Sequence, residues 1–310
     1  MTGTEPVVRP PSGQPEPRRL VRRRLPVALL ALAACSAPAA PPVFPVDQAI
    51  GAFGRDPASP VIARSTDPAA PDYAGATAPS VWSDAQGLHA AYLGLDADGG
   101  RSILAADSQD GHAWTKRSAP LVADDKTLGR PAALATDGGL FLFYARENGS
   151  GGTDVVLQGG GVVVPGADEP AALAAGGYYW IYALADGGIH AYASASAASG
   201  YRDQGVVLAP GPDGGFDGHA VSAPAALAET SALGRTLFRL WYAGTDVAGD
   251  TPSIGLAGAF DGVTFEKDAD NPVRFHGDVP SVFPLDGGFG MLYSETSFAD
   301  PSDISLATRP

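Results

Sequence analysis

The chain has 310 residues and a formal net charge of −14, and 45% of its residues are hydrophobic while 17% are charged. This balance excludes intrinsic disorder over most of the chain, and the acidic surplus argues against nucleic acid or an anionic membrane surface as a partner. Glycine and proline together make up about 22% of the residues, which favours many short strands joined by turns over a helical protein, and the single cysteine excludes an intrachain disulfide or a zinc site built from cysteines.

The first 34 residues are predicted to be an export signal. Six arginines lie within residues 1–24, and an apolar run covers residues 25–34. A basic segment followed by a short apolar run is typical of such a signal, and this run is shorter than the roughly 20 apolar residues of a transmembrane helix. The segment Leu32-Ala33-Ala34-Cys35 resembles the lipobox of bacterial lipoproteins, which implies that Cys35 becomes the first mature residue and carries a lipid. The alternative is a plain secretory signal in which Cys35 is incidental.

Residues 35–49 are predicted to be a tether rich in proline and alanine that leads to the folded part of the chain, residues 50–310. Removal of residues 1–34 would change the net charge from −14 to −18, so membrane attachment would rest on the acyl chains of Cys35 rather than on a basic patch. The expected location is the cell envelope, with the lipid in the outer membrane or at the cell surface. Ser36, in place of an acidic residue, favours the outer membrane by resemblance to other lipoproteins.

Five copies of one sequence unit follow the tether. Each copy has a proline, a glycine-containing turn and an aromatic-rich segment that ends in tyrosine. The prolines are Pro79, Pro131, Pro170, Pro224 and Pro280. Neighbouring prolines are 52, 39, 54 and 56 residues apart, and the tyrosines follow them by 12 to 18 residues. Each copy therefore predicts a strand that opens with proline, whose missing N–H removes no ladder bond there, then a turn and a second strand.

Further strands complete each unit. In the first and fourth copies an Asp-Gly pair stands between the third and fourth strands, and it indicates a tight hairpin because glycine adopts positive φ readily. The predicted strands are 102–105, 114–122, 254–257 and 265–273. Four antiparallel strands in about 40–55 residues is the period of a propeller blade. The sequence therefore predicts an all-β fold, a five-bladed β-propeller over residues 50–310.

The last copy ends with its third strand, predicted over residues 303–307. Its fourth strand is predicted to come from the other end of the domain, because residues 53–61 resemble residues 265–273 of the fourth copy. We expect residues 53–64 to pair with the last blade and close the ring, which protects edges that an open ring would expose. The alternative is an isolated strand before the first blade.

These units, with X-Pro on each inner strand and Asp-Gly-x-x-Trp/Phe hairpins, resemble the five-bladed propeller glycoside hydrolases of the arabinanase, levansucrase and invertase superfamily. The likeness covers roughly residues 50–310. It implies that the residue before each inner-strand proline faces a central funnel, where carboxylates act as base, acid and modulator. The five positions hold Ala78, Arg130, Glu169, Ala223 and Val279. Because Glu169 is the only carboxylate among them, the family mechanism does not carry over.

Other acids stand close to these positions in the sequence, namely Asp168, Asp278, Glu147 and Glu295. Either one of them joins Glu169 in the funnel, or all four are solvated loop carboxylates. Arg130 and Glu169 occupy equivalent positions on neighbouring blades, so they are expected to meet near the axis. They would form either an ion pair that fills a narrow channel or a ligand clamp, in which the planar guanidinium of Arg130 donates to hydroxyl or carboxylate oxygens.

The histidines indicate no metal site, because none of them forms an HxH or HExxH pattern, and no cofactor is predicted. His219 and His276 precede inner-strand prolines by five and four residues, so they are candidates for the rim of the funnel. His89 and His190 fall within predicted strands, where packing or surface roles are expected.

The sequence therefore favours a non-catalytic binding module for glycans or another small polar ligand. The expected protein is monomeric, does not bind nucleic acid, and contacts the membrane through its N-terminal lipid. The alternative is a glycoside hydrolase with relocated carboxylates, in which Glu169 is the catalytic candidate. A third interpretation is a structural propeller that binds a protein on one face.

Overall fold

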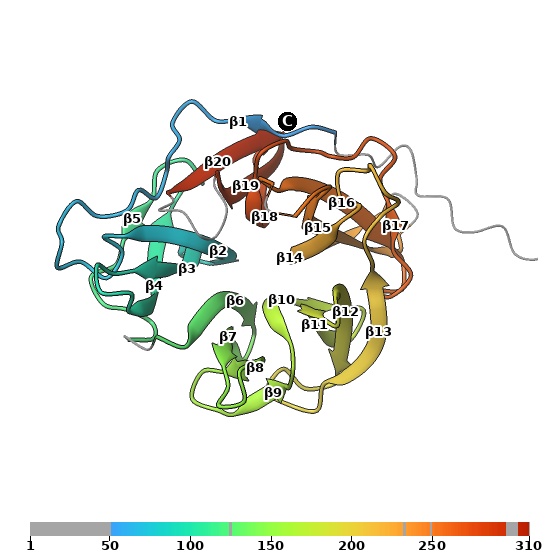
Figure 1. Cartoon of the computed structure of the whole chain (residues 1–310), viewed down its shortest axis with the longest axis horizontal. Helices are drawn as coiled ribbons and strands as arrows, with labels where there is room; N and C mark the ends of the chain where they lie inside the picture. Colours follow the sequence, from blue (N-terminus) through green and yellow to red (C-terminus); the bar gives the residue numbers. More distant parts are fainter. Residues whose placement is uncertain (1–50, 124–125, 232–233, 249, 296–302, 310) are drawn as a thin grey trace, which may run out of the picture. The chain divides into compact units, whose positions relative to one another are not determined.

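The computed structural model describes residues 51–123, 126–231, 234–248, 250–295 and 303–309. The predicted signal, Cys35 and the tether lie outside these ranges. Five sheets of four antiparallel strands stand in a ring around a central axis (Figure 1). The predicted five-bladed β-propeller is thus confirmed. In the described ranges no helix is long and apolar enough to cross a membrane.

Strand order is the same in the first four blades, from the axis outward. Blade one consists of β2 (Gly75–Asp84), β3 (Gly87–Leu95), β4 (Arg101–Ser108) and β5 (Thr115–Lys116). Blade two consists of β6 (Leu128–Thr136), β7 (Gly139–Glu147), β8 (Thr153–Leu157) and β9 (Val162–Val164). Blade three consists of β10 (Asp168–Ala175), β11 (Tyr178–Ala185), β12 (Gly188–Ser194) and β13 (Arg202–Leu208). Blade four consists of β14 (Ala220–Thr230), β15 (Thr236–Thr245), β16 (Ser253–Ala259) and β17 (Glu266–Lys267).

Blade five combines the two ends of the domain. From the axis outward, its first three strands are β18 (Asp278–Leu285), β19 (Gly288–Ser294) and β20 (Ile304–Arg309), and β1 (Gly54–Arg55) is its outermost strand. In β1, Gly54 pairs with Thr308, and an isolated bridge joins Ile62 to Ile304. The predicted closure of the ring by residues 53–64 is therefore confirmed. Figure 1 shows β1 lying beside β20 at the edge of the ring.

Each inner strand contains a break in register at its proline. The shifts lie between Thr77 and Ser80 on β2, and at the equivalent places on β6, β10, β14 and β18. Proline has no N–H to contribute to the ladder, so the break falls where no backbone bond is lost. The residue before the proline has positive φ, between 43° and 52°, on four of the five strands, and Arg130 is the exception. Positive φ is strained for a β-branched residue such as Val279.

The outermost strands are shorter than the sequence predicts. Instead of nine residues, β5 and β17 each have two, and isolated bridges at Ile103↔Val122 and Ile254↔Arg274 continue the pairing. The Asp-Gly turns are also wider than tight hairpins. Asp261 accepts hydrogen bonds from the N–H groups of Val263 and Thr264, so its carboxylate organises a loop of several residues before the next strand begins.

Candidate functional site

The five positions before the inner-strand prolines divide the axis into an apolar and a polar side. Ala78, Ala223 and Val279, from blades one, four and five, are at most 2% exposed and belong to one apolar cluster. Arg130 and Glu169, from blades two and three, supply the charged groups. Three of the five positions therefore carry no group that can transfer a proton.

Arg130 is a buried cation with unused hydrogen-bonding capacity. Its side chain is 4% exposed, and Nη2 donates to the carbonyl oxygen of Pro280 on β18 at 2.7 Å. Nε and Nη1 are buried and have no acceptor among the described residues. Burial lowers the pKa of Arg130 to about 10, against the opposing effect of the Glu169, Asp278 and Asp168 charges. The group is thus still a cation at neutral pH, with two donors left over.

Glu169 is a half-buried carboxyl group with a raised pKa. Burial raises its pKa to about 7, and the charges of Asp278 and Asp168 add to the rise. The N–H of Ala223, which donates to Oε2 at 2.6 Å, and the charge of Arg130 act in the opposite direction. Arg130 and Glu169 influence each other electrostatically, but within the described ranges no ion pair of 4.0 Å or less joins them.

Asp168 and Asp278 stand immediately before the pre-proline residues of blades three and five. Oδ1 of Asp168 accepts the N–H of Glu169, and Oδ1 of Asp278 accepts the N–H of Val279, both at 2.7 Å. Asp278 is 7% exposed, and its burial raises its pKa despite the charge of Arg130. Asp278 is therefore not a solvated loop carboxylate, and Asp168 is half-buried. Arg130, Asp168, Glu169 and Asp278 form the axial cluster.

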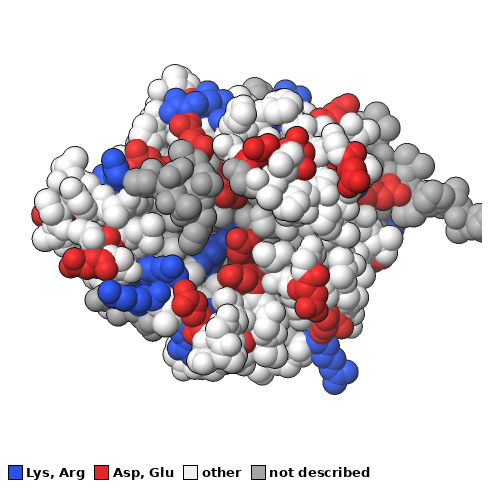
Figure 2. All heavy atoms as spheres, in the orientation of Figure 1, with Lys and Arg blue, Asp and Glu red and all other residues white. Residues whose placement is uncertain are grey.

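The channel along the axis is narrow. A cavity of about 40 Å³ lies between the inner strands, lined by Arg130, four of the five inner-strand prolines and small residues such as Ser80 and Ser281. A space of this size holds water molecules rather than a sugar ring. A ligand of Arg130 therefore has to approach from an end of the channel. Figure 2 shows one face of the ring hollowed at its centre, where basic and acidic side chains lie close together.

The other predicted site residues are not part of the axial cluster. His219 and His276 are exposed on the segments that lead into β14 and β18, and their imidazoles make no hydrogen bond or ion pair with any described residue. Glu295 contacts Arg55 of β1 and accepts a hydrogen bond from Tyr293 at 3.0 Å, so the closing strand engages its carboxylate. Glu147 forms an ion pair with Arg101 at 3.2 Å, and its side chain is 57% exposed.

Sequence reasoning missed two exposed aromatic residues at the end of the blades where the inner strands begin. Phe275 is 66% exposed and Tyr73 is 37% exposed. They precede the prolines of β18 and β2 by five and six residues, and blades five and one are neighbours. Their position ahead of the repeated proline was the available signal. Among the residues that the structure describes, no group of His, Cys, Asp and Glu side chains is arranged to hold a metal ion.

Several solved structures resemble this chain. A glycosyl hydrolase from Bacteroides ovatus has a TM-score of 0.68 at 16% identity and covers 84% of this chain and 94% of its own. A β-1,2-mannobiose phosphorylase from Listeria innocua has a TM-score of 0.60 at 16% identity, covering 83% and 95%. The catalytic domain of a GH62 α-L-arabinofuranosidase from Coprinopsis cinerea has a TM-score of 0.61 at 10% identity, covering 84% and 97%. No protein-family model and no curated protein sequence matches the chain. The five-bladed fold is therefore similar to that of glycoside hydrolase propellers.

Proposed function

We propose that the propeller is a non-catalytic binding module for a glycan or another small polar ligand. The observation that carries this proposal is Arg130, which is 4% exposed yet keeps two donors, Nε and Nη1, without an acceptor among the described residues. A ligand oxygen that accepts from these charged donors in place of water gains a hydrogen bond to a charged group, which contributes about 1.5–3 kcal/mol. A guanidinium donates well to paired hydroxyl or carboxylate oxygens.

The absence of proton-transfer groups at Ala78, Ala223 and Val279 supports a binding role over catalysis. Oε2 of Glu169 is already engaged by the N–H of Ala223, and Asp168 and Asp278 hold backbone N–H groups. Phe275 and Tyr73 add exposed aromatic surface near the start of the inner strands, against which a sugar ring can pack.

We also propose that the protein is an exported lipoprotein anchored through Cys35. The basic segment, the apolar run and Leu32-Ala33-Ala34-Cys35 support this proposal. Such an anchor would present the propeller at the cell envelope, where glycans are available as ligands. Labelling with radioactive palmitate tests it: incorporation should be lost in Cys35→Ser, and incorporation that persists in this variant would refute the anchor.

A second candidate function is glycoside hydrolysis, and one observation favours it. The pKa of Glu169 is raised to about 7, as a general acid near neutral pH requires, and the Asp278 and Asp168 carboxylates are close enough to influence it. Glycosidases place two carboxyl groups across the scissile bond, about 5–5.5 Å apart for retention and 6.5–9.5 Å apart for inversion. Glu169 would then be the acid, and Asp278 or Asp168 the second carboxylate.

One experiment separates the two candidates. The purified chain is titrated with β-1,2-mannobiose and arabino-oligosaccharides by calorimetry, because the structural neighbours include proteins named for such substrates. Binding should weaken at least about tenfold in Arg130→Gln and remain unchanged in Arg64→Gln, which removes the same charge from an exposed site. The same variants are assayed with chromogenic mannosides and arabinofuranosides, with and without phosphate. Turnover by the unmodified chain that is lost in Glu169→Gln would establish the hydrolase instead. An affinity that is unchanged in Arg130→Gln would overturn the proposed ligand contact.

A further inference from the structure

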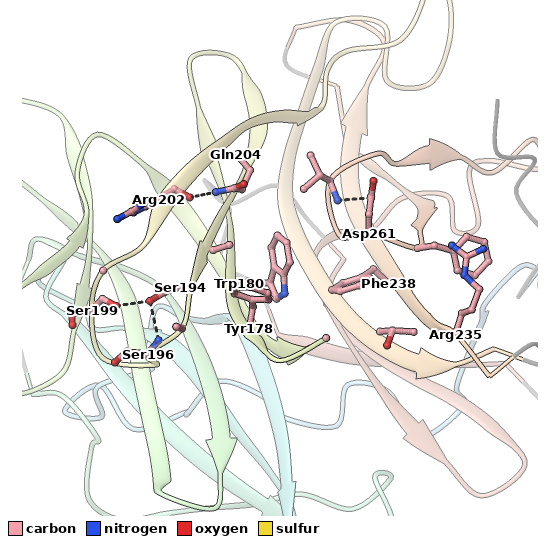
Figure 3. Close-up of a pocket in the computed structure, with 17 residues that line it drawn as sticks. Tyr178, Trp180, Ser194, Ser196, Ser199, Arg202, Gln204, Arg235, Phe238 and Asp261 are labelled. Carbon is pink, nitrogen blue, oxygen red and sulfur yellow. Dashed lines mark hydrogen bonds between the residues drawn. The ribbon is translucent and has the colours of Figure 1, made fainter. Parts of the chain in front are cut away.

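A second cavity lies between blades three and four, at the end of the blades opposite the axial cluster. It has a volume of about 1040 Å³ and includes Gly176, in the turn that joins β10 to β11, and Arg235, just before β15. The axial cluster lies at the other end of these strands, because Asp168 and Glu169 begin β10. We call this cavity the blade three–four groove. Figure 3 shows its labelled side chains, with Tyr178 and Trp180 between Arg202 on one side and Arg235 on the other.

Tyr178 provides an aromatic surface in the groove. It is 53% exposed, and its ring meets the edge of Trp180 at a centroid distance of 6.3 Å. Trp180 is itself fixed, because Nε1 donates to the carbonyl oxygen of Ala175 at 3.1 Å and the indole stacks on Tyr182 with an interplanar angle of 5°. An exposed aromatic ring on a rigid strand loses little conformational entropy on binding. Tyr178 is therefore a suitable platform for a flat apolar surface such as a sugar face.

Two guanidinium groups flank this platform. Arg202 begins β13, and Arg235 lies with its guanidinium carbon 4.1 Å from the centre of the Phe260 ring, which restrains it. In the part of the chain that the structure describes, neither guanidinium has an acidic partner within 4.0 Å. Asp261 lines the same groove, but its Oδ1 accepts the N–H groups of Val263 and Thr264. Asp261 keeps its negative charge, so the charged side chains that line the groove sum to one positive charge. In a chain of net charge −14, this local positive surplus beside an exposed aromatic ring indicates a preference for anions.

We propose that the blade three–four groove binds an acidic oligosaccharide, with carboxylate groups paired to Arg202 and Arg235 and a sugar ring stacked on Tyr178. The volume lies at the upper end of small-molecule sites, which suits several sugar units rather than one. Gln204 and the serine side chains of the same groove supply hydrogen-bonding groups for hydroxyls. A neutral glycan would leave the two cations unpaired, and the acidic surface elsewhere disfavours nucleic acid. This site is separate from the one that contains Arg130, so either proposal can fail without the other.

The test uses tetragalacturonate as the probe and its fully methyl-esterified form as the control, titrated into the purified chain by calorimetry. The ester has the same sugar rings and no carboxylate charge. We expect saturable binding of the acid that weakens at least about tenfold on esterification, in Arg202→Gln and in Arg235→Gln. Tyr178→Ala should lower the affinity at high as well as low salt concentration, because stacking on the ring does not depend on charge. Tyr178→Phe should retain binding because it keeps the ring face.

A matched variant separates a specific site from general attraction. Arg64→Gln removes one exposed positive charge from a residue that does not line the groove, and it should leave the affinity for tetragalacturonate unchanged. The proposal is overturned if the chain does not bind tetragalacturonate, if the ester binds equally well, or if Arg64→Gln weakens binding as much as the groove variants do. Because Tyr178, Arg202 and Arg235 are exposed, their variants should fold, and thermal unfolding checks this directly.

Discussion

Asp168 and Asp278 perform the same structural task on blades three and five. Each uses Oδ1 to accept the N–H of the next residue at 2.7 Å, and each of those residues, Glu169 and Val279, has positive φ before a proline. The short bond offsets part of the strain of that conformation. The two aspartates therefore shape the backbone at the axis, in addition to their electrostatic effect on Glu169.

Removing the Asp278 carboxyl group should destabilise the fold. Asp278→Ala loses a buried acceptor and leaves the N–H of Val279 unpaired, so we expect a loss of about 1–3 kcal/mol in the free energy of unfolding. Asp278→Asn keeps an acceptor oxygen and should lose less. Asp168→Ala should also lose less, because Asp168 is half-buried. Urea denaturation measures all three, and equal losses in Asp278→Asn and Asp278→Ala would rule out the hydrogen bond as the cause.

Replacing Arg130 with an apolar side chain should separate stability from binding. Arg130→Met removes a buried charge with two unpaired donors, at the loss of the bond to Pro280. Because no ion pair of 4.0 Å or less joins Arg130 to a carboxylate among the described residues, its replacement relieves the cost of burying a charge and leaves no broken pair, so the free energy of unfolding should stay within about 1 kcal/mol or rise. Ligand binding at the axis should be lost. A destabilisation of about 3–5 kcal/mol would instead mean that Arg130 is a structural member of a buried charge pair.

Stability should fall as the pH rises through the titration of Glu169. Its pKa is raised from 4.5 to about 7 in the folded protein, so the folded state binds the proton more tightly than the unfolded chain. The stabilisation that the proton on Glu169 provides is fully present below pH 4.5 and is lost as the pH rises to about 7. The free energy of unfolding falls by up to about 3 kcal/mol over this range. Glu169→Gln cannot ionise and should remove this part of the pH dependence. The prediction is contradicted if the free energies of unfolding of the two proteins change in parallel between about pH 4 and about pH 8.

Gly262 should not tolerate alanine, because it supports the wall of the blade three–four groove. Its φ is +77°, and a Cβ there would lie 3.1 Å from both Trp180 and Phe238. Gly187 has nearly the same φ, +79°, with open space around the position of a Cβ. Both Gly→Ala variants carry the backbone strain of about 1–2 kcal/mol, but Gly262→Ala should lose more through the clash. Thermal unfolding compares them, and similar melting temperatures would contradict the expected clash.

The repeat allowed the ring to be predicted from the sequence, because the spacing of Pro79 and its equivalents gives the blade period. The closure was predictable because residues 53–61 resemble residues 265–273. The left-handed backbone at Ala78 and Val279 was not predictable, since nothing in an Ala-Pro or Val-Pro pair signals positive φ. The role of Asp278 was hidden for the same reason. The blade three–four groove depends on how two blades pack, so the spacing of Tyr178 and Arg235 in the sequence contains no sign that they line one cavity.

The pairing of β1 with β20 has a consequence for the order in which the molecule can form during synthesis. Gly54 is made among the first residues of the domain, and its partner Thr308 is made among the last. A nascent chain can fold blades one to four as they emerge from the ribosome, but blade five lacks its third strand until β20 has been made. The complete ring therefore forms only after β20 has emerged from the ribosomal tunnel.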